Sequence, residues 1–209
     1  GLKDEEELLR RRYLDLLTNP ETKELFVKKN IFWQTVRGFL SREGFLEVQT
    51  PVLEHVPGGA DAEPFVTHHN ALDQDFFLRI SLELPLKRLI VAGFEKVYEI
   101  GRVFRNEGVD RQHNPDFTEL EFYWAYADYK DMMKFTEGML VSLLKQLFGK
   151  TKIKYEGKEI DFKTPWPRTE YGKLIRKYTK LDIDTLNRDS LLKEAKKLGL
   201  APEDTWSKG

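Results

Sequence analysis

The sequence predicts an α+β fold in which an antiparallel sheet is flanked by helices. Two segments with strand character, residues 97–104 and 118–125, are separated only by the polar, turn-like residues 105–117. Such a short connection favours an antiparallel pair, because a parallel pair usually needs a helical crossover. Segments with the helical spacing of apolar residues, 20–43 and 131–148, stand on either side of this pair in the chain.

The N-terminal part is predicted to be mainly helical. Residues 4–17 are charged and carry one apolar stripe, which indicates a first helix. Asn19 and Pro20 suit the N-cap and the first position of a second helix, and Gly44 suits its C-terminal end. Residues 45–50 then alternate between apolar and polar, as expected of a strand.

The middle of the chain is expected to alternate between loops and short elements. Residues 54–76 are loop-rich, and a strand follows at residues 76–80. Ser81 is expected to cap a helix that closes at Gly93. The remaining expected elements are a hairpin over residues 153–162 that turns at Glu156-Gly157, and a helix over residues 189–198.

The composition limits the classes of function. The 209 residues carry 34 basic and 35 acidic side chains, which argues against a strongly basic arm for nucleic acid and against an acidic tail. The absence of cysteine excludes disulfides, thiol catalysis and cysteine-ligated zinc. No apolar run approaches the roughly 20 residues that cross a bilayer. We therefore expect no membrane partner and a cytoplasmic location.

Alternation along the strand at residues 118–125 places polar groups on one face. Glu119, Glu121 and Tyr123 share that face, and the apolar residues between them can pack on helices. An exposed strand face often alternates in this way without any function, and for each residue alone that remains the alternative. The cluster as a whole favours a binding site, because several charges surround short apolar strands.

The end of the preceding strand suits a nucleotide phosphate. Arg105 stands beside a loop, where its planar guanidinium could hold a phosphate through two hydrogen bonds. Phe117 could stack on a base, and Glu107 could accept a hydrogen bond from an exocyclic amine.

Several ordered blocks of the sequence resemble class II aminoacyl-tRNA synthetases, in the form found in the lysyl-tRNA synthetases of subclass IIb. Three segments resemble motif 2 of that family: Phe104–Gly108, His113–Thr118 and Glu121–Tyr129. Gly38–Pro51 resembles motif 1, which in the family is an interface helix that runs into a strand ending in proline. Further matches are Pro57–Ala60, Thr67–Leu72, Leu78–Ile80 and Glu83-Leu84.

The resemblance implies an ATP site. Arg105 matches the catalytic arginine that holds the α-phosphate of ATP and the carboxylate of the amino acid. Glu107 matches the residue that contacts the adenine amino group. His113 and Asn114 match loop residues that face the triphosphate, and Phe117 matches the ring that stacks on adenine.

The resemblance also implies a pocket for L-lysine. Glu83, Glu121 and Tyr123 match its polar residues, and carboxylate and hydroxyl acceptors suit an ammonium with three donors. Gly59 matches the small residue whose backbone lies against the substrate, although a turn glycine is an equally compatible reading.

A metal site formed by this chain is not expected. The histidines do not have the spacing of metal ligands and lack a further ligand nearby; they include His55, His68 and His69. The resemblance instead implies Mg²⁺ that bridges the ATP phosphates, with its protein ligands mostly outside this chain.

The resemblance predicts a truncated member of the family. Residues 1–20 match a linker helix, and residues 21–209 match a partial catalytic domain with motifs 1 and 2. Motif 3 and the anticodon-binding OB-fold have no counterpart. The implied reaction is activation of L-lysine to lysyl-adenylate and its transfer to tRNA(Lys), by a homodimer formed through motif 1. We expect the chain alone to be inactive or weakly active.

Two alternatives stay open on the sequence. The first is a synthetase-like paralogue that attaches lysine to a protein acceptor. The second is a non-catalytic module for dimerisation or regulation, in which motif 1 mediates association and the site stays incomplete.

Overall fold

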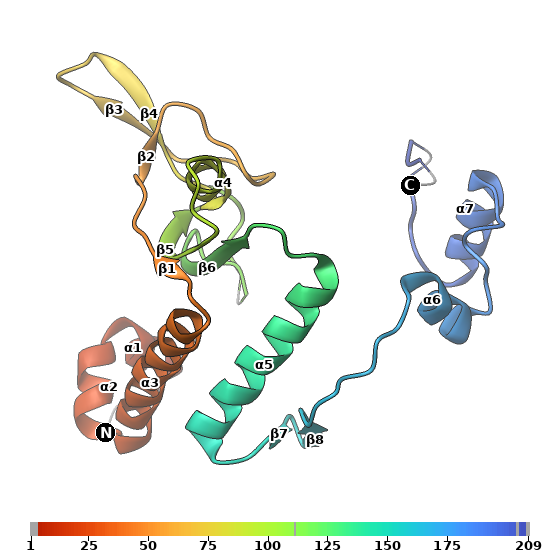
Figure 1. Cartoon of the computed structure of the whole chain (residues 1–209), viewed down its shortest axis with the longest axis horizontal. Coiled ribbons are helices and arrows are strands. Elements are labelled where there is room, and N and C mark those ends of the chain that lie inside the picture. Colours follow the sequence, from red (N-terminus) through yellow and green to blue (C-terminus); the bar gives the residue numbers. More distant parts are fainter. Residues whose placement is uncertain (1–3, 111, 204, 208–209) are drawn as a thin grey trace. The chain divides into compact units, whose positions relative to one another are not determined.

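The computed structural model describes residues 4–110, 112–203 and 205–207. It divides into two compact units, one up to Thr164 and one from Pro165 onward. Residues 1–3 of the expected linker helix and Arg111 of the motif 2 loop lie outside the described residues. Figure 1 shows the elements in order along the chain.

Three helices open the first unit: α1 (Glu5–Arg10), α2 (Arg12–Thr18) and α3 (Pro20–Arg42). The prediction of one helix over residues 4–17 was wrong, because Arg11 leaves the helical conformation between α1 and α2. Asp15 of α2 is buried, where its carboxylate pairs with Arg12 and accepts a hydrogen bond from Thr22. Helical propensity could not show this contact with α3.

The ends of α3 confirm the expected capping. The Asn19 side chain accepts a hydrogen bond from the backbone N–H of Glu21, and Pro20 occupies the first helical position. Gly44 follows the helix with a φ of +83°, a conformation that glycine adopts at no steric cost.

The main sheet has the order β1-β5-β6, with β1 (Leu46–Glu47), β5 (Lys96–Phe104) and β6 (Asp116–Trp124). β5 and β6 are antiparallel, as predicted, whereas β1 adds a parallel edge. β1 is shorter than the expected strand at residues 45–50, because the backbone N–H of Thr50 donates to the Glu99 side chain at 3.0 Å. That bond replaces the one a continued strand would make.

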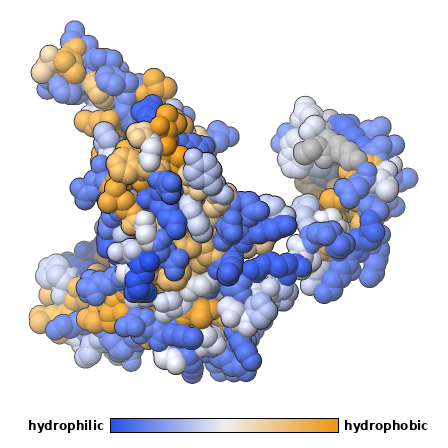
Figure 2. Space-filling model, in the orientation of Figure 1, coloured by the Kyte–Doolittle hydropathy of each residue, from blue (hydrophilic) through white to orange (hydrophobic). Residues whose placement is uncertain are grey.

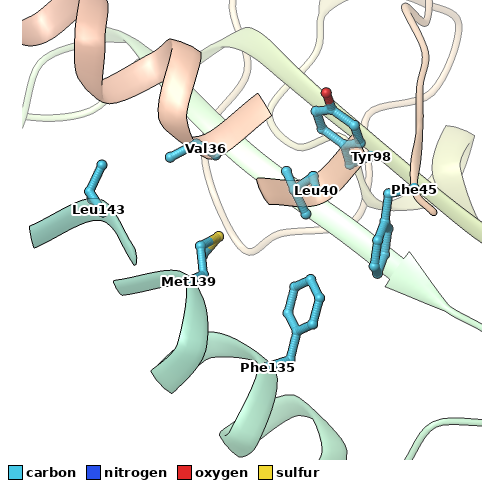
Figure 3. Packing of buried hydrophobic residues seen from close by; sticks show 7 residues of the cluster. All are labelled: Val36, Leu40, Phe45, Tyr98, Phe135, Met139 and Leu143. Atoms are coloured by element: carbon cyan, nitrogen blue, oxygen red, sulfur yellow. The ribbon is translucent and has the colours of Figure 1, made fainter. Parts of the chain in front are cut away.

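The helices α3 and α5 (Tyr129–Phe148) cover one face of β5 and β6. The core between them, drawn in Figure 3, consists of Val36, Leu40, Phe45, Tyr98, Phe135, Met139 and Leu143. The apolar face of β6 packs on this core, as the alternation predicted, through Leu120, Phe122 and Trp124.

The opposite face of β5 and β6 packs on α4 (Glu83–Val91). Leu82, Leu86, Val97 and Val103 form this second cluster, with Phe117 and Tyr123 packed against it. The polar face of β6 therefore lies beside the N-terminal end of α4.

A second sheet has the order β2-β4-β3, with β2 (Leu53–Glu54), β3 (Val66–His69) and β4 (Gln74–Leu78). The prediction of a loop over residues 54–76 missed the β3–β4 hairpin and placed its second strand two residues too late. The hairpin turns at Asp73, which adopts a φ of +47° without a glycine. The exposed, mostly polar residues of β3 also lack the alternation that marks a half-buried strand.

The first unit ends with a hairpin of β7 (Lys152–Tyr155) and β8 (Lys158–Asp161), which turns at Glu156-Gly157 as predicted. The second unit contains α6 (Tyr171–Thr179), which was not predicted, and α7 (Arg188–Lys197), which was. None of the described helices is long and apolar enough to span a bilayer.

Candidate functional site

The motif 2 residues line one cavity of about 280 Å³ at the end of β5 and the start of β6. All five candidate ATP-binding residues line this cavity: Arg105, Glu107, His113, Asn114 and Phe117. The antiparallel pairing of β5 with β6 produces this arrangement, because it folds the 105–115 loop back over the strand ends.

Arg105 is held in place from several sides. Its Nε donates to the carbonyl oxygen of Ile80 at 3.3 Å, and its guanidinium carbon lies 5.1 Å from the centre of the Phe117 ring. Its Nη2 lies 3.8 Å from Oε1 of Glu119. The side chain is 31% exposed, so the cation remains accessible to an anion in the cavity.

Backbone contacts join the 105–115 loop to a distant segment. The Asn106 N–H donates to the Glu63 carbonyl at 2.7 Å, and the Glu63 N–H donates to Oε1 of Glu107 at 3.4 Å. The Glu107 side chain is exposed.

His113 is oriented by Asp110. Its Nδ1 lies 2.8 Å from Oδ2 of Asp110, while Oδ1 of the same carboxylate accepts from the backbone N–H groups of Gln112 and His113. The hydrogen bond from the Gln112 N–H, followed by that from the His113 ring, lowers the pKa of Asp110. An anionic Asp110 therefore presents the imidazole to the cavity.

The lysine candidates gather around the N-terminal end of α4. Oε1 of Glu121 accepts from the Ser81 hydroxyl at 2.7 Å and from the Leu82 N–H at 2.9 Å. Oε2 of Glu121 accepts from the Tyr123 hydroxyl at 3.0 Å. Burial, and then the negative charge of Glu121, raise the pKa of Tyr123, so the phenol stays neutral.

Gly59 and Glu83 complete this group. Gly59 has a φ of +87°, and a Cβ there would lie 2.8 Å from Cβ of Glu83 and 3.0 Å from Oγ of Ser81. The glycine is therefore required both by its conformation and by the close approach of its backbone to α4. Glu83 pairs with Lys87 one turn along the helix at 2.7 Å.

The sequence missed three polar residues next to the candidates. Ser81 was predicted as the cap of α4, but the N-cap is Leu82. The Oγ of Ser81 accepts from the Glu83 N–H and donates to Glu121. Arg79 and Glu99 form a buried ion pair of 2.7 Å beside the site, with Glu99 directly opposite Glu121 in the strand pair, and no sequence spacing indicates this pair. These partners come from different elements, so only the tertiary structure brings them together.

The residues of the site do not fit Mg²⁺ on their own. Among the described residues that line the cavity, Glu107 is the one with a carboxylate. Mg²⁺ prefers several oxygen ligands in octahedral geometry, which a single carboxylate does not provide. Throughout the described part of the chain, no three acidic or histidine side chains are placed to hold a metal ion.

Comparison with known proteins identifies the family of the chain. Residues 4–201 match the family described as tRNA synthetases class II (D, K and N). The chain is 52% identical over 189 residues to a lysine--tRNA ligase of Clostridium botulinum and covers 38% of its length. It is 51% identical over 210 residues to a lysine--tRNA ligase of Thermoanaerobacter sp., of which it covers 42%. The chain thus spans about two fifths of these relatives, and it belongs to the class II tRNA synthetases of the D, K and N group.

Proposed function

We propose that this chain takes part in the ATP-dependent activation of L-lysine to lysyl-adenylate and in the transfer of lysine to tRNA(Lys). The observation that carries the proposal is the cavity of motif 2, where all five ATP candidates meet. The names of the relatives, each a lysine--tRNA ligase, support lysine and tRNA as the substrates of this reaction, which we propose takes place in the cytoplasm.

The proposed role of Arg105 follows from the negative charge that develops at the α-phosphate during adenylate formation. A carboxylate oxygen of lysine attacks the α-phosphorus of ATP, a bond to phosphorus forms, and pyrophosphate leaves. Arg105 would stabilise the negative charge shared between the carboxylate and the phosphoryl oxygens, and its contacts with Ile80 and Phe117 orient it beforehand.

The lysine side chain would lie toward Glu121 and Tyr123. Oε2 of Glu121 and the Tyr123 hydroxyl are 3.0 Å apart, so both could contact one ammonium group. Because Oε1 of Glu121 is fixed by Ser81 and Leu82, the carboxylate is oriented before a ligand arrives.

Replacing Arg105 tests the proposal. We expect Arg105→Lys to weaken ATP binding about tenfold or more, because a lysine cannot replace two guanidinium hydrogen bonds. The matched control is Arg102→Lys, since Arg102 lies on the same strand but pairs with Asp116 at the surface. Calorimetric titration with ATP measures both variants. A wild-type chain that binds neither ATP nor lysine would refute the proposal.

We further propose a homodimer formed through motif 1. Leu46 in that motif and Leu53, two residues after its end, expose apolar side chains, and beside them residues 48–51, residues 53–56 and α4 line a surface hollow of about 810 Å³. Figure 2 shows additional apolar surface (orange) over the N-terminal helices, where Leu17 and Phe26 are exposed. Exposed apolar surface of this kind is typical of protein contacts. Light scattering of the wild type and of Leu53→Asp tests this, with a dimer expected for the first and a monomer for the second.

A further inference from the structure

Arg79 belongs to a segment that resembles the family, Leu78–Ile80, yet the proposed function gives it no role. Its side chain is 4% exposed and pairs at 2.7 Å with Oε1 of Glu99, whose side chain is 3% exposed. Both charges lose their hydration, so a buried pair of this kind contributes little net stability. The position of Arg79 between other parts of the chain indicates what it does instead.

Hydrogen bonds from Arg79 join its segment to β5 and to the loop between β1 and β2. Nε donates to the carbonyl oxygen of Arg102 at 2.8 Å, and the backbone carbonyl of Arg79 accepts from the Phe104 N–H at 2.9 Å. On the loop side, Nη1 donates to the carbonyl oxygen of Thr50 at 3.0 Å, and the backbone N–H donates to that of Val52 at 2.9 Å. A planar guanidinium holds such partners at fixed angles, which a lysine ammonium cannot reproduce.

The residues that follow in this segment contact both parts of the candidate site. The carbonyl oxygen of Ile80 accepts from Nε of Arg105 on the ATP side. The Ser81 hydroxyl and the Leu82 N–H donate to Glu121 on the lysine side. One short stretch of backbone therefore sets the positions of the phosphate-binding cation and of the ammonium-binding carboxylate together.

We propose that Arg79 is a positioning residue, which holds residues 80–82 in the arrangement that binds ATP and lysine and thereby links the two affinities. The inference rests on the proposed function, and it adds a residue that touches neither ligand. When such a segment adopts the binding arrangement for only part of the time, the affinities for both ligands fall by the same factor. Either ligand then restores the affinity for the other, because its own contacts hold the segment in place.

Arg79→Lys tests the inference, since it keeps the charge and removes the hydrogen bond to Arg102. The ligands are lysine and α,β-methylene-ATP, in which a P–C bond replaces the P–O bond that breaks during activation, so that no product forms. We expect Arg79→Lys to weaken each ligand alone about tenfold, as for a segment that spends about a tenth of the time in the binding arrangement. A saturating concentration of one ligand should return the affinity for the other to within about twofold of the wild type under the same condition. Calorimetric titration of the 209-residue chain measures these affinities.

Two further variants separate positioning from a loss of stability. Tyr98→Phe removes a buried hydrogen bond on the opposite face of β5 and should leave both affinities unchanged. Thr50→Val removes the hydroxyl that contacts Nη1 of Arg79 and Oε2 of Glu99. It should lower both affinities equally but by a smaller factor, and it carries the test if Arg79→Lys does not fold. Urea unfolding establishes that each variant is folded during the titration.

The outcomes distinguish this inference from the proposed function. A fall in one affinity alone overturns the inference, because residues 80–82 then do not join the two parts of the site. A fall in both that the second ligand does not reverse overturns it as well, and so do unchanged affinities in a folded Arg79→Lys chain. All of these results leave the proposed function intact. If the wild-type chain binds neither ligand, the proposed function fails and the inference fails with it.

Discussion

Tyr98 of β5 is buried in the core, and its hydroxyl forms a hydrogen bond with β1. The hydroxyl donates to Oε2 of Glu47 at 2.9 Å, and Arg37 of α3 donates to Oε1 of the same carboxylate. Burial and the bond to Glu47 raise the pKa of Tyr98 to about 12, so the phenol keeps its proton and remains a donor at neutral pH.

We expect Tyr98→Phe to lower the free energy of unfolding by about 1 kcal/mol, the usual contribution of one such hydrogen bond. The loss stays modest because Arg37 still pairs with Glu47. Urea unfolding measures the change. Tyr126→Phe serves as the control, since the Tyr126 side chain is fully exposed. A loss equal to that of the control would show that the bond contributes nothing.

The raised pKa of Glu54 makes the free energy of unfolding depend on pH. Burial raises its pKa above the ordinary value of 4.5, against the opposing charges of Arg79 and Arg88. The folded state therefore holds the proton more tightly, and the stability that this contributes is present below pH 4.5 and is lost as the pH rises through the folded pKa.

We expect Glu54→Gln to stabilise the protein at pH 7 relative to the wild type, and the difference to shrink toward pH 4. Thermal unfolding of both proteins across this range measures it. A difference that grows on acidification would contradict the sign of the shift.

At the scale of elements, the packing of Arg79 against β5 depends on the absence of a side chain at Gly101. A Cβ at this position would lie 2.3 Å from Nη2 of Arg79 and 2.8 Å from Oε1 of Glu99. Both residues belong to the buried ion pair beside the site. The glycine therefore leaves room for the two charges to meet on the polar face of the sheet.

We expect Gly101→Ala to lower the free energy of unfolding by about 3 kcal/mol or more, because it separates a buried ion pair. Gly108→Ala is the control, since no atom lies within 4 Å of the added Cβ. Urea unfolding measures both. Equal stability of the two variants would mean that the pair can shift without cost.

The elements also show which patterns the sequence could resolve. The alternation along β6 predicted its two faces, because one side packs on α3 and α5 and the other on α4. The β3–β4 hairpin was missed, since most of its exposed residues lack alternation and its turn contains no glycine. Apolar–polar alternation therefore predicted a strand correctly where one face of the strand carries apolar residues and the other polar ones.

At the scale of the whole molecule, the two units differ in the core they contain. Every candidate site residue lies in the unit that ends at Thr164. No described residue from Pro165 onward is buried, so the second unit has little apolar core of its own.

We expect residues 1–164 to fold alone and to keep the affinity of the full chain for ATP and lysine within about twofold, because every candidate site residue belongs to the first unit. We expect residues 165–209 alone to be largely unfolded. Circular dichroism and calorimetric titration check both. Loss of folding in residues 1–164 would show that the units depend on each other.

The sequence by itself determined the family, the motif 2 residues and most helices, since each depends on residue type, spacing or capping within a short stretch. Only the tertiary structure decided that Arg105 lies near Glu119, that Ser81 donates to Glu121, and that Arg79 pairs with Glu99 in the space left by Gly101. Those contacts join residues 14 to 40 positions apart on different elements. Local pattern carries no information on such distances, because side-chain packing between elements fixes them.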